Sequence, residues 1–390
     1  MNNISVRYLW LVIIMFLSMC SIAMAHQIPK DADEFIKSEE CSGCHQEIYM
    51  EWKESFHSKS SAHINKAHAA VHKAYSNAME QSGKEGNYYC GSCHTPMASN
   101  LKELMNGEAQ LDEKDWTQTE GVGCAFCHRI ENVLHMLKFN QYRITKDNAF
   151  AVSYNVTNAP HQVVTSPVFS TGEMCMGCHS HNINSNGAPI CVMKEEGDDN
   201  CLKCHMPRVE GAKAIGSKSK THLSHKISGA HDIDMLREAV SMDSSLIHKD
   251  GKTTLEVILS NKISHTFPST NPMRLAYVRV KILGKNKHTI WSNFTKSPME
   301  DKTAVFFKAF KNLDKVGVPS WAATDIAFDT RLKAKEIRTL NYPIVVEKGV
   351  RIIVELVYKL FPPDALDTLG IPRDGVNDID YIIHKEEIGL

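Results

Sequence analysis

One pattern limits what this chain can fold into more than any other feature: the sequence Cys-x-x-Cys-His occurs five times. The copies are Cys41–His45, Cys90–His94, Cys124–His128, Cys175–His179 and Cys201–His205. Given 12 Cys and 20 His among 390 residues, random placement would produce roughly 0.02 copies. The pattern is typical of c-type haem attachment, because two thiols one helical turn apart can add to the two vinyl groups of a porphyrin, and the adjacent His then lies under the iron. The sequence therefore predicts five covalently bound haem c groups.

Each motif supplies two kinds of site residue. The predicted attachment residues are the paired cysteines Cys41, Cys44, Cys90, Cys93, Cys124, Cys127, Cys175, Cys178, Cys201 and Cys204. The predicted proximal iron ligands are His45, His94, His128, His179 and His205. Outside the motifs only Cys20 and Cys191 remain. We interpret Cys191 as a small core residue beside Ile190 and Val192, with an axial ligand or a reactive thiol as the alternative.

The first 25 residues are typical of a secretory signal peptide. Arg7 precedes an apolar run, Tyr8–Met19, which is followed by the small-residue cleavage pattern Ala23–Ala25. We expect cleavage after Ala25 and a periplasmic protein, with an uncleaved anchor as the alternative. No later stretch is apolar and long enough to suggest a membrane span.

Charge gives limited information about partners. The formal net charge of −1 provides no reason to expect nucleic acid. Bound haems add propionates, so the loaded protein is more acidic than its sequence, and this overall charge suggests a basic partner. The expected partners are other redox proteins of the periplasm.

The residue in the sixth position of each iron separates two functions. Two strong ligands close an iron, which then only passes electrons, whereas an open iron can bind a small molecule. Histidines outside the motifs outnumber the five positions to be filled. Electron transfer is the favoured hypothesis, and the alternative is an oxidoreductase with one open haem that acts on a small nitrogen or sulfur compound. A docking role for the C-terminal part is compatible with either.

A resemblance to a known family narrows the choice of sixth ligands. The first motif followed by Trp52, Ser55 and His57 resembles the opening of the multihaem cytochromes c, a class that includes the tetrahaem partner of hydroxylamine oxidoreductase. Similar family segments surround the third and fifth motifs and the stretch 222–231, so that the resemblance covers roughly residues 38 to 275. The resemblance implies five distal ligands: His57, His161, His225, His231 and His265. The family's Gly before the last of these is replaced by Ser264.

His68 and His72 form a separate case. They are four residues apart in a segment that reads as a helix, so they share one face. We expect a solvated helix face, with a further distal ligand or a weak metal site as the alternative.

The pattern of the chain changes near residue 240, and the predicted class is α+β. Residues 26–240 are predicted to form a pentahaem domain with short helices after the motifs and long irregular connections, such as 129–174. Residues 241–390 are predicted to form an all-β, sandwich-like domain. Alternating apolar residues predict a short helix at 232–241 and strands at 253–260, 274–283, 289–294, 304–310, 337–346 and 350–360. Gly284–Lys287 reads as a hairpin loop, and the tail from Asp364 reads as polar loop.

Overall fold

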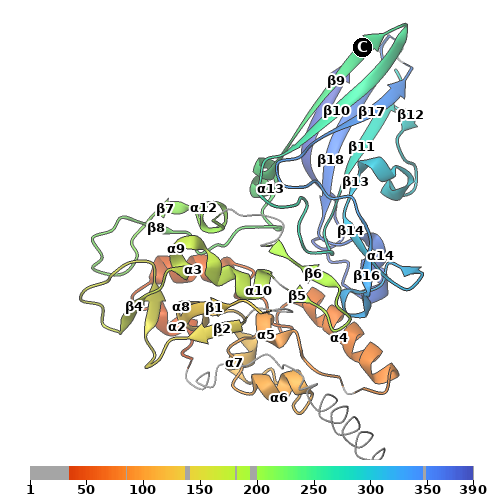
Figure 1. The fold of residues 1–390 in the computed structure, drawn as a ribbon. Helices are drawn as coiled ribbons and strands as arrows, with labels where there is room; N and C mark the ends of the chain where they lie inside the picture. The colour runs from red at the N-terminus through yellow and green to blue at the C-terminus, as the bar shows by residue number, and fades with distance from the viewer. Residues whose placement is uncertain are drawn as a thin grey trace, which may run out of the picture.

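The computed structural model describes residues 35–84, 86–136, 141–180, 182–193, 200–345 and 348–389, so the predicted signal peptide lies outside the described residues. Short helices and small sheets form one end of the molecule, and two long sheets form the other (Figure 1). The predicted α+β class is confirmed. None of the helices within these ranges is both long and apolar enough to cross a membrane.

The haem-motif end consists mostly of one-turn helices. Four motifs are themselves helices that end on the motif His: α5 (Gly91–His94), α8 (Cys124–His128), α10 (Met176–His179) and α12 (Leu202–His205). Within the described residues, the first motif alone is followed directly by a helix, because α2 (Ser38–Cys41) ends within it and α3 (Gln46–Glu54) begins immediately after it. The remaining helices here are α4 (Lys66–Gln81), α6 (Leu101–Asn106), α7 (Trp116–Thr119) and α9 (Val168–Thr171).

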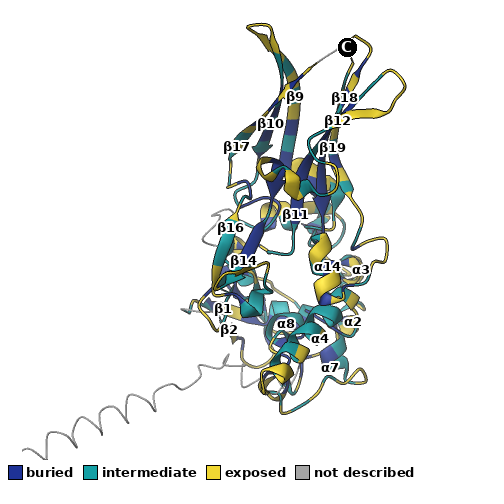
Figure 2. Cartoon of the chain, turned by 90° about the vertical axis from the view of Figure 1, so that its right-hand side faces the viewer, coloured by how far each residue is buried: buried dark blue, intermediate teal, exposed yellow. Residues whose placement is uncertain are grey.

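Four two-stranded sheets lie among these helices. The pairs are β1 (Ile130–Leu134) with β2 (Gln141–Ile144), β3 (Phe150–Val152) with β4 (Val163–Thr165), β5 (Asn182–Ile183) with β6 (Pro189–Cys191), and β7 (Arg208–Glu210) with β8 (Thr221–Leu223). The expected irregular connection 129–174 therefore contains short strands. Apolar clusters at this end are small, and most helical residues are only partly buried (Figure 2).

Two antiparallel sheets form the β region. One has the strand order β17 (Ile337–Ile344), β10 (Lys252–Asn261), β9 (Val240–Lys249). The other has the order β12 (Thr289–Ser292), β11 (Leu275–Leu283), β18 (Arg351–Lys359), β19 (Tyr381–Gly389), with β13 (Val305–Phe306) also on β11. Alternating side chains such as Leu255, Val257, Val278 and Val280 fill one continuous core between the sheets. Helix α13 (Ile233–Ala239) packs on this core.

The predicted strands agree with observed ones, with four corrections, one of which is that strands at 315–316 and 325–329 were not predicted. The segment 304–310 is split at Phe307 into β13 and β14 (Lys308–Asn312). Strand β9 was not predicted. The expected loop-like tail contains helix α14 (Pro363–Leu369) and strand β19.

A third sheet joins the two ends of the molecule. It consists of β14, β15 (Lys315–Val316) and β16 (Asp325–Asp329) and lies toward β6 (Figure 1). The buried Lys308 donates from Nζ to the carbonyl of Ile190 at 3.1 Å. Asn184 donates from Nδ2 to the carbonyls of Ser320 and Ala323, both at 2.8 Å. These polar contacts fix the β region against the haem-motif region.

Candidate haem sites

One large cavity runs through the haem-motif end. Its volume is about 3400 Å³, and its lining includes all ten motif cysteines and all five motif histidines. Pockets for single small ligands usually have volumes of a few hundred Å³. A cavity of this size with this lining fits several porphyrins arranged in one group.

Three motif histidines are oriented to bind a metal through Nε2. The Nδ1 atom of His45 lies 2.6 Å from the carbonyl oxygen of Lys213, and that of His205 lies 2.6 Å from the carbonyl of Ser228. His128 makes the same contact with Ala151 at 3.0 Å. An Nδ1–H that donates to a carbonyl leaves the lone pair on Nε2, which is the arrangement usual for metal-bound histidine.

Four of these histidines face a second imidazole across the cavity. The ring centres are 6.4 Å apart for His45 and His161, 6.2 Å for His57 and His179, 6.2 Å for His128 and His225, and 6.4 Å for His205 and His265. Two metal–nitrogen bonds of about 2 Å, with roughly 1 Å from each nitrogen to its ring centre, span about 6 Å. The spacing therefore fits one metal ion between each pair. Burial lowers the pKa of His57 and of His225 to about 4, which favours the neutral form that a ligand requires.

Three of the four second imidazoles make the same backbone contact. Nδ1 lies 2.8 Å from the carbonyl of Leu223 in His225, 3.0 Å from that of Thr266 in His265, and 3.3 Å from that of Gln162 in His161. His222, from the same segment as His225, differs because both of its ring nitrogens are engaged, with Glu51 and with the carbonyl of Gly211. Its role is structural.

The fifth motif histidine, His94, has a different neighbour. The ring of His68 lies 4.0 Å from that of His94, which is too close for an iron between them. Both Nδ1 atoms approach the same carbonyl, that of Ser60, at 2.8 Å for His68 and 3.1 Å for His94. The two rings therefore lie side by side, and His68 does not line the cavity.

The expectation of a solvated face for His68 and His72 is wrong. His68 Nε2 and His72 Nδ1 are inaccessible to solvent and have no hydrogen-bond partner among the described residues. The ring of Tyr88 packs against both, at 5.7 Å and 4.7 Å. Burial, with the nearby His94, lowers the pKa of His68 to about 2.

His231, the remaining predicted ligand, is placed elsewhere. It lines the cavity, but its ring stacks on Phe56 with the centres 3.6 Å apart. Burial, with the nearby Arg274, lowers its pKa to about 3. The described structure brings it opposite none of the motif histidines.

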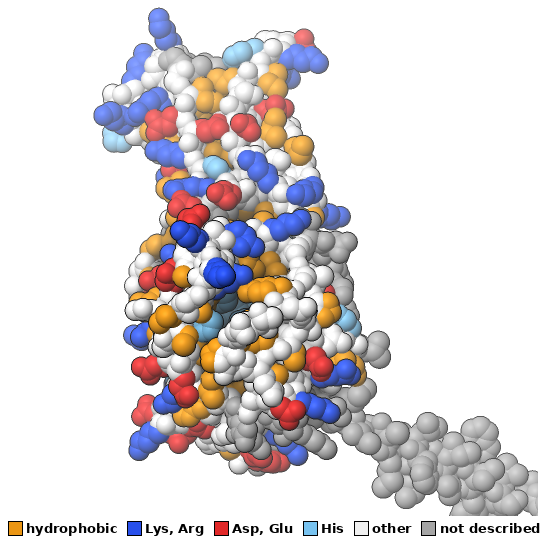
Figure 3. All heavy atoms as spheres, turned by 90° about the vertical axis from the view of Figure 1, so that its left-hand side faces the viewer, with side chains coloured by type: hydrophobic (Ala, Val, Ile, Leu, Met, Phe, Trp, Pro, Cys, Tyr) orange, Lys and Arg blue, Asp and Glu red, His pale blue; other side chains and the backbone are white. Residues whose placement is uncertain are grey.

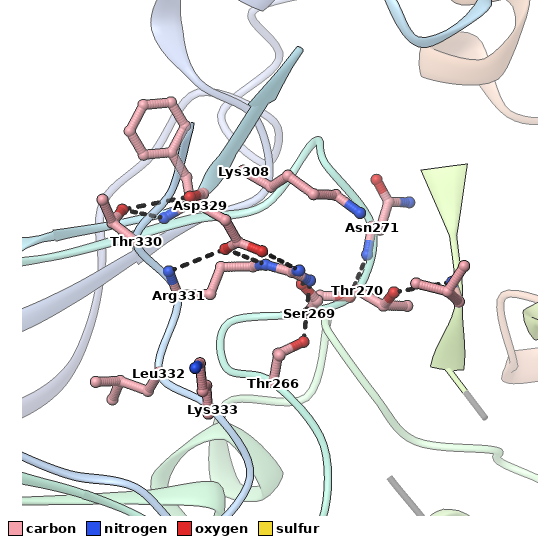
Figure 4. Close-up of polar contacts among 12 residues, drawn as sticks. Thr266, Ser269, Thr270, Asn271, Lys308, Asp329, Thr330, Arg331, Leu332 and Lys333 are labelled. Carbon is pink, nitrogen blue, oxygen red and sulfur yellow. Dashed lines mark hydrogen bonds and ion pairs between the residues drawn. The ribbon is translucent and has the colours of Figure 1, made fainter. Parts of the chain in front are cut away.

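A buried charged network holds the loop that carries His265 (Figure 4). Arg331 donates from Nη1 to the hydroxyl of Thr266 at 3.0 Å and to the carbonyl of Ser269 at 2.9 Å. Its guanidinium also pairs with Asp329, with an N–O distance of 2.6 Å. The loop therefore keeps a defined shape although it lacks the glycine of the family pattern.

Contacts between motif cysteines give the order of the sites in space. Thiols touch between the first and third motifs (Cys41, Cys124), the second and fourth (Cys93, Cys178), and the fourth and fifth (Cys175, Cys201). Within the ten motif cysteines, only Cys44 and Cys204 are exposed. The first and fifth sites therefore lie nearest the surface.

Sequence reasoning did not identify Tyr142. Its hydroxyl donates to Cys178 Sγ at 3.2 Å, and its ring fills the space in which a side chain at Gly177 would lie. No local pattern marks this residue, because the contact joins β2 to a motif far along the chain. Cys191, which we expected in the core, is only partly buried and donates from its thiol to the carbonyl of His179 at 3.3 Å.

Two comparisons with known proteins concern the fold of the chain and its N-terminal motif region. A family described as cytochrome c554 and c-prime matches residues 40–129. The crystal structure of a penta-heme cytochrome c552 from Thermochromatium tepidum superposes with a TM-score of 0.77 and 23% identity, covering 91% of this chain and 99% of that chain. No curated protein matches the sequence. The chain therefore has the fold of a pentahaem cytochrome c, and its residues 40–129 are similar to the family of cytochrome c554 and c-prime.

Proposed function

We propose that this chain is a periplasmic electron carrier with five covalently attached haem c groups, four of them closed by two histidines. The observation that carries the proposal is the set of four imidazole pairs spaced 6.2–6.4 Å apart along one cavity. Haem supplies the redox chemistry when it is bound. The chain attaches it, orients the axial imidazoles through backbone carbonyls, and excludes water.

The contacts between motifs support a continuous route for electrons. The first site adjoins the third, and the fourth adjoins both the second and the fifth. Tyr142 lies between the third and fourth sites, where it touches Phe126 and Cys178. Electrons would enter and leave at the first and fifth sites, whose attachment residues Cys44 and Cys204 are exposed. Redox proteins of the periplasm are the partners that we propose.

Mass and spectra test the haem content. The mass of the purified protein should exceed the calculated mass of its mature polypeptide by five haem units. Electron paramagnetic resonance of the oxidised protein should show mainly low-spin iron. A mass gain of four haems or fewer in fully matured protein, or mainly high-spin iron, would contradict the proposal.

A matched pair of substitutions tests the ligand assignment. His57→Ala should convert about one iron in five to high spin and allow carbon monoxide to bind, because His57 faces His179 at 6.2 Å. His231→Ala should leave every iron as in the parent protein, because His231 stacks on Phe56. The reverse result would restore His231 as a ligand and remove His57.

A second candidate function rests on the His94 site. Within the described residues, no imidazole lies opposite His94 at the spacing of the other four pairs, and His68 shares its carbonyl partner instead. An open iron there would support an oxidoreductase acting on a small nitrogen or sulfur compound. Parent protein with about one high-spin iron in five, which binds nitrite or hydroxylamine, would favour this candidate. Five low-spin irons would exclude it.

A further inference from the structure

Two loops that hold the first haem site also form a patch on the surface. Loop 211–220 carries the Lys213 carbonyl that orients His45, and the amide of Ile215 in this loop donates to the carbonyl of Cys44 at 2.9 Å. Loop 153–161 carries His161, the second imidazole of the same site. The Lys213 ammonium joins the loops, since it donates to the Tyr154 hydroxyl at 2.9 Å and lies 4.2 Å from the centre of that ring.

These two loops expose both apolar and basic side chains. Ile215 is 75% exposed, Tyr154 46% and Val156 39%. Exposed Lys218 and Lys220 lie on the same loop as Ile215. Lys and Arg side chains gather on this face of the molecule near the level of β7 and β8, close to hydrophobic and histidine side chains that reach the surface (Figure 3). We call the set Tyr154, Val156, Lys213, Ile215, Lys218 and Lys220 the haem-edge patch.

Acidic groups lie at the base of the hairpin rather than at its tip. Glu210 is in β7, and Glu47 lies beside Gly211 where the loop begins. Within the described residues, neither Lys218 nor Lys220 forms an ion pair. Haem propionates sit on the porphyrin edge opposite the thioether bonds, so the edge near Cys44 is the one free of carboxylates. The local charge of the patch is therefore positive, although the loaded protein as a whole is acidic.

From this arrangement, and resting on the proposed electron-transfer function, we infer that the haem-edge patch docks an acidic redox protein that exchanges electrons with the His45 haem. Exposed apolar side chains next to three lysines suit transient association, in which opposite charges accelerate the encounter and a small apolar contact aligns the partners. One electron passes from the reduced partner to the ferric haem, and no bond forms or breaks. The partner is recognised by negative charge around its own redox centre.

Stopped-flow reduction by a plant-type [2Fe–2S] ferredoxin, a strongly acidic redox protein, tests the inference on the haem-loaded chain. At low salt, Lys218→Glu combined with Lys220→Glu should lower the second-order rate constant about tenfold or more, and high salt should abolish the difference. Ile215→Ser should slow the reaction severalfold at both salt concentrations, because it removes an apolar contact.

The matched control reverses two lysines far from this patch. Lys285→Glu combined with Lys287→Glu, in the exposed loop between β11 and β12, makes the same change in net charge and should have little effect. An equal slowing by this control, or no slowing by the first pair, would overturn the inference. It would also be overturned if the first pair abolished binding to phosphatidylglycerol vesicles yet left ferredoxin kinetics unchanged, since the patch would then bind membranes.

A neutral hydroquinone whose redox potential lies below those of the haems separates this inference from the proposed function. It should reduce the parent and all variants at the same rate, because no charge steers it. Parent haems that fail to cycle with the hydroquinone would contradict electron transfer itself. Normal cycling with unchanged ferredoxin kinetics in the Lys218, Lys220 variant would contradict only the docking surface.

Discussion

The two ends of the molecule are stabilised in different ways. The β region has one continuous apolar core to which both long sheets contribute, with Leu255, Val278 and Ile352 fully buried. The haem-motif region has small separate clusters around a cavity of about 3400 Å³. The side chains of the β region form its apolar core by themselves. The haem-motif region is expected to be well packed only when bound porphyrins fill its cavity with apolar surface. The following predictions test this difference.

Haem removal should produce the largest effect. In a chain whose ten motif cysteines are replaced by alanine, amide hydrogens of the haem-motif region should exchange several orders of magnitude faster, while those of β10, β11 and β18 stay protected. Hydrogen exchange read by mass spectrometry resolves the two regions. If the amide hydrogens of the haem-motif region stayed protected without haem, its polypeptide packing alone would stabilise it. The proposed difference between the two regions would then be wrong.

One histidine of the β region should affect a haem. His265→Ala should create one high-spin iron among five, because His265 faces His205 at 6.4 Å, and carbon monoxide should then bind. His248→Ala is the control, since His248 is an exposed residue of β9. Unchanged low-spin spectra in His265→Ala would mean that the β region contributes no ligand.

Substitution of Arg331 should show that a residue of the β region affects both the stability of the fold and the ligation of a haem. Arg331→Met should lower the free energy of unfolding by about 2 kcal/mol, because it removes two hydrogen bonds from the buried guanidinium to the His265 loop, together with its pair with the exposed Asp329. A partial high-spin signal should accompany this loss. Lys311→Met, which removes an exposed pair with Asp325, should cost about 0.5 kcal/mol. Equal losses in urea titrations of the two variants would contradict the assigned role of Arg331.

The smallest effect should be a dependence on pH that is confined to the β region. Burial opposes ionisation of Asp380, but contacts with Lys359, Tyr277 and Arg279 hold its pKa below the ordinary value. The folded state therefore binds this proton more weakly than the unfolded state. The stabilisation is present above about pH 4 and is lost as pH falls through the folded pKa. Asp380→Asn should flatten this part of the stability profile, and an identical acid slope in the variant would count against it.

The proposed attachment residues could be assigned from the sequence because the pattern that marks them is local. The Cys-x-x-Cys-His spacing specifies one haem without reference to the rest of the chain, and the strongly alternating strands β11 and β18 were recognised for the same reason. Strands β9 and β19 were missed since each is an edge strand with few buried side chains. A strand with few buried side chains shows little alternation of apolar and polar residues in its sequence.

Distal positions depend on contacts between distant segments. His57 was proposed as a ligand from its local motif. Nothing in the sequence indicated that it faces His179 rather than another motif histidine. His68 has the spacing of a solvated helix, and its burial comes from Tyr88, which lies beyond the end of α4. Long-range packing of this kind leaves no periodic signal.

The four imidazole pairs can also be regarded as cross-links in a polymer. Bound through iron, they would close loops from His45 to His161, His57 to His179, His128 to His225 and His205 to His265. Each loop overlaps the next along the chain. Every residue from His45 to His265 therefore lies within at least one closed loop. Every such closure removes unfolded-state entropy worth about 4 kcal/mol. A single cut in this stretch would leave both fragments joined, and the whole stretch would have to lose its structure as one unit.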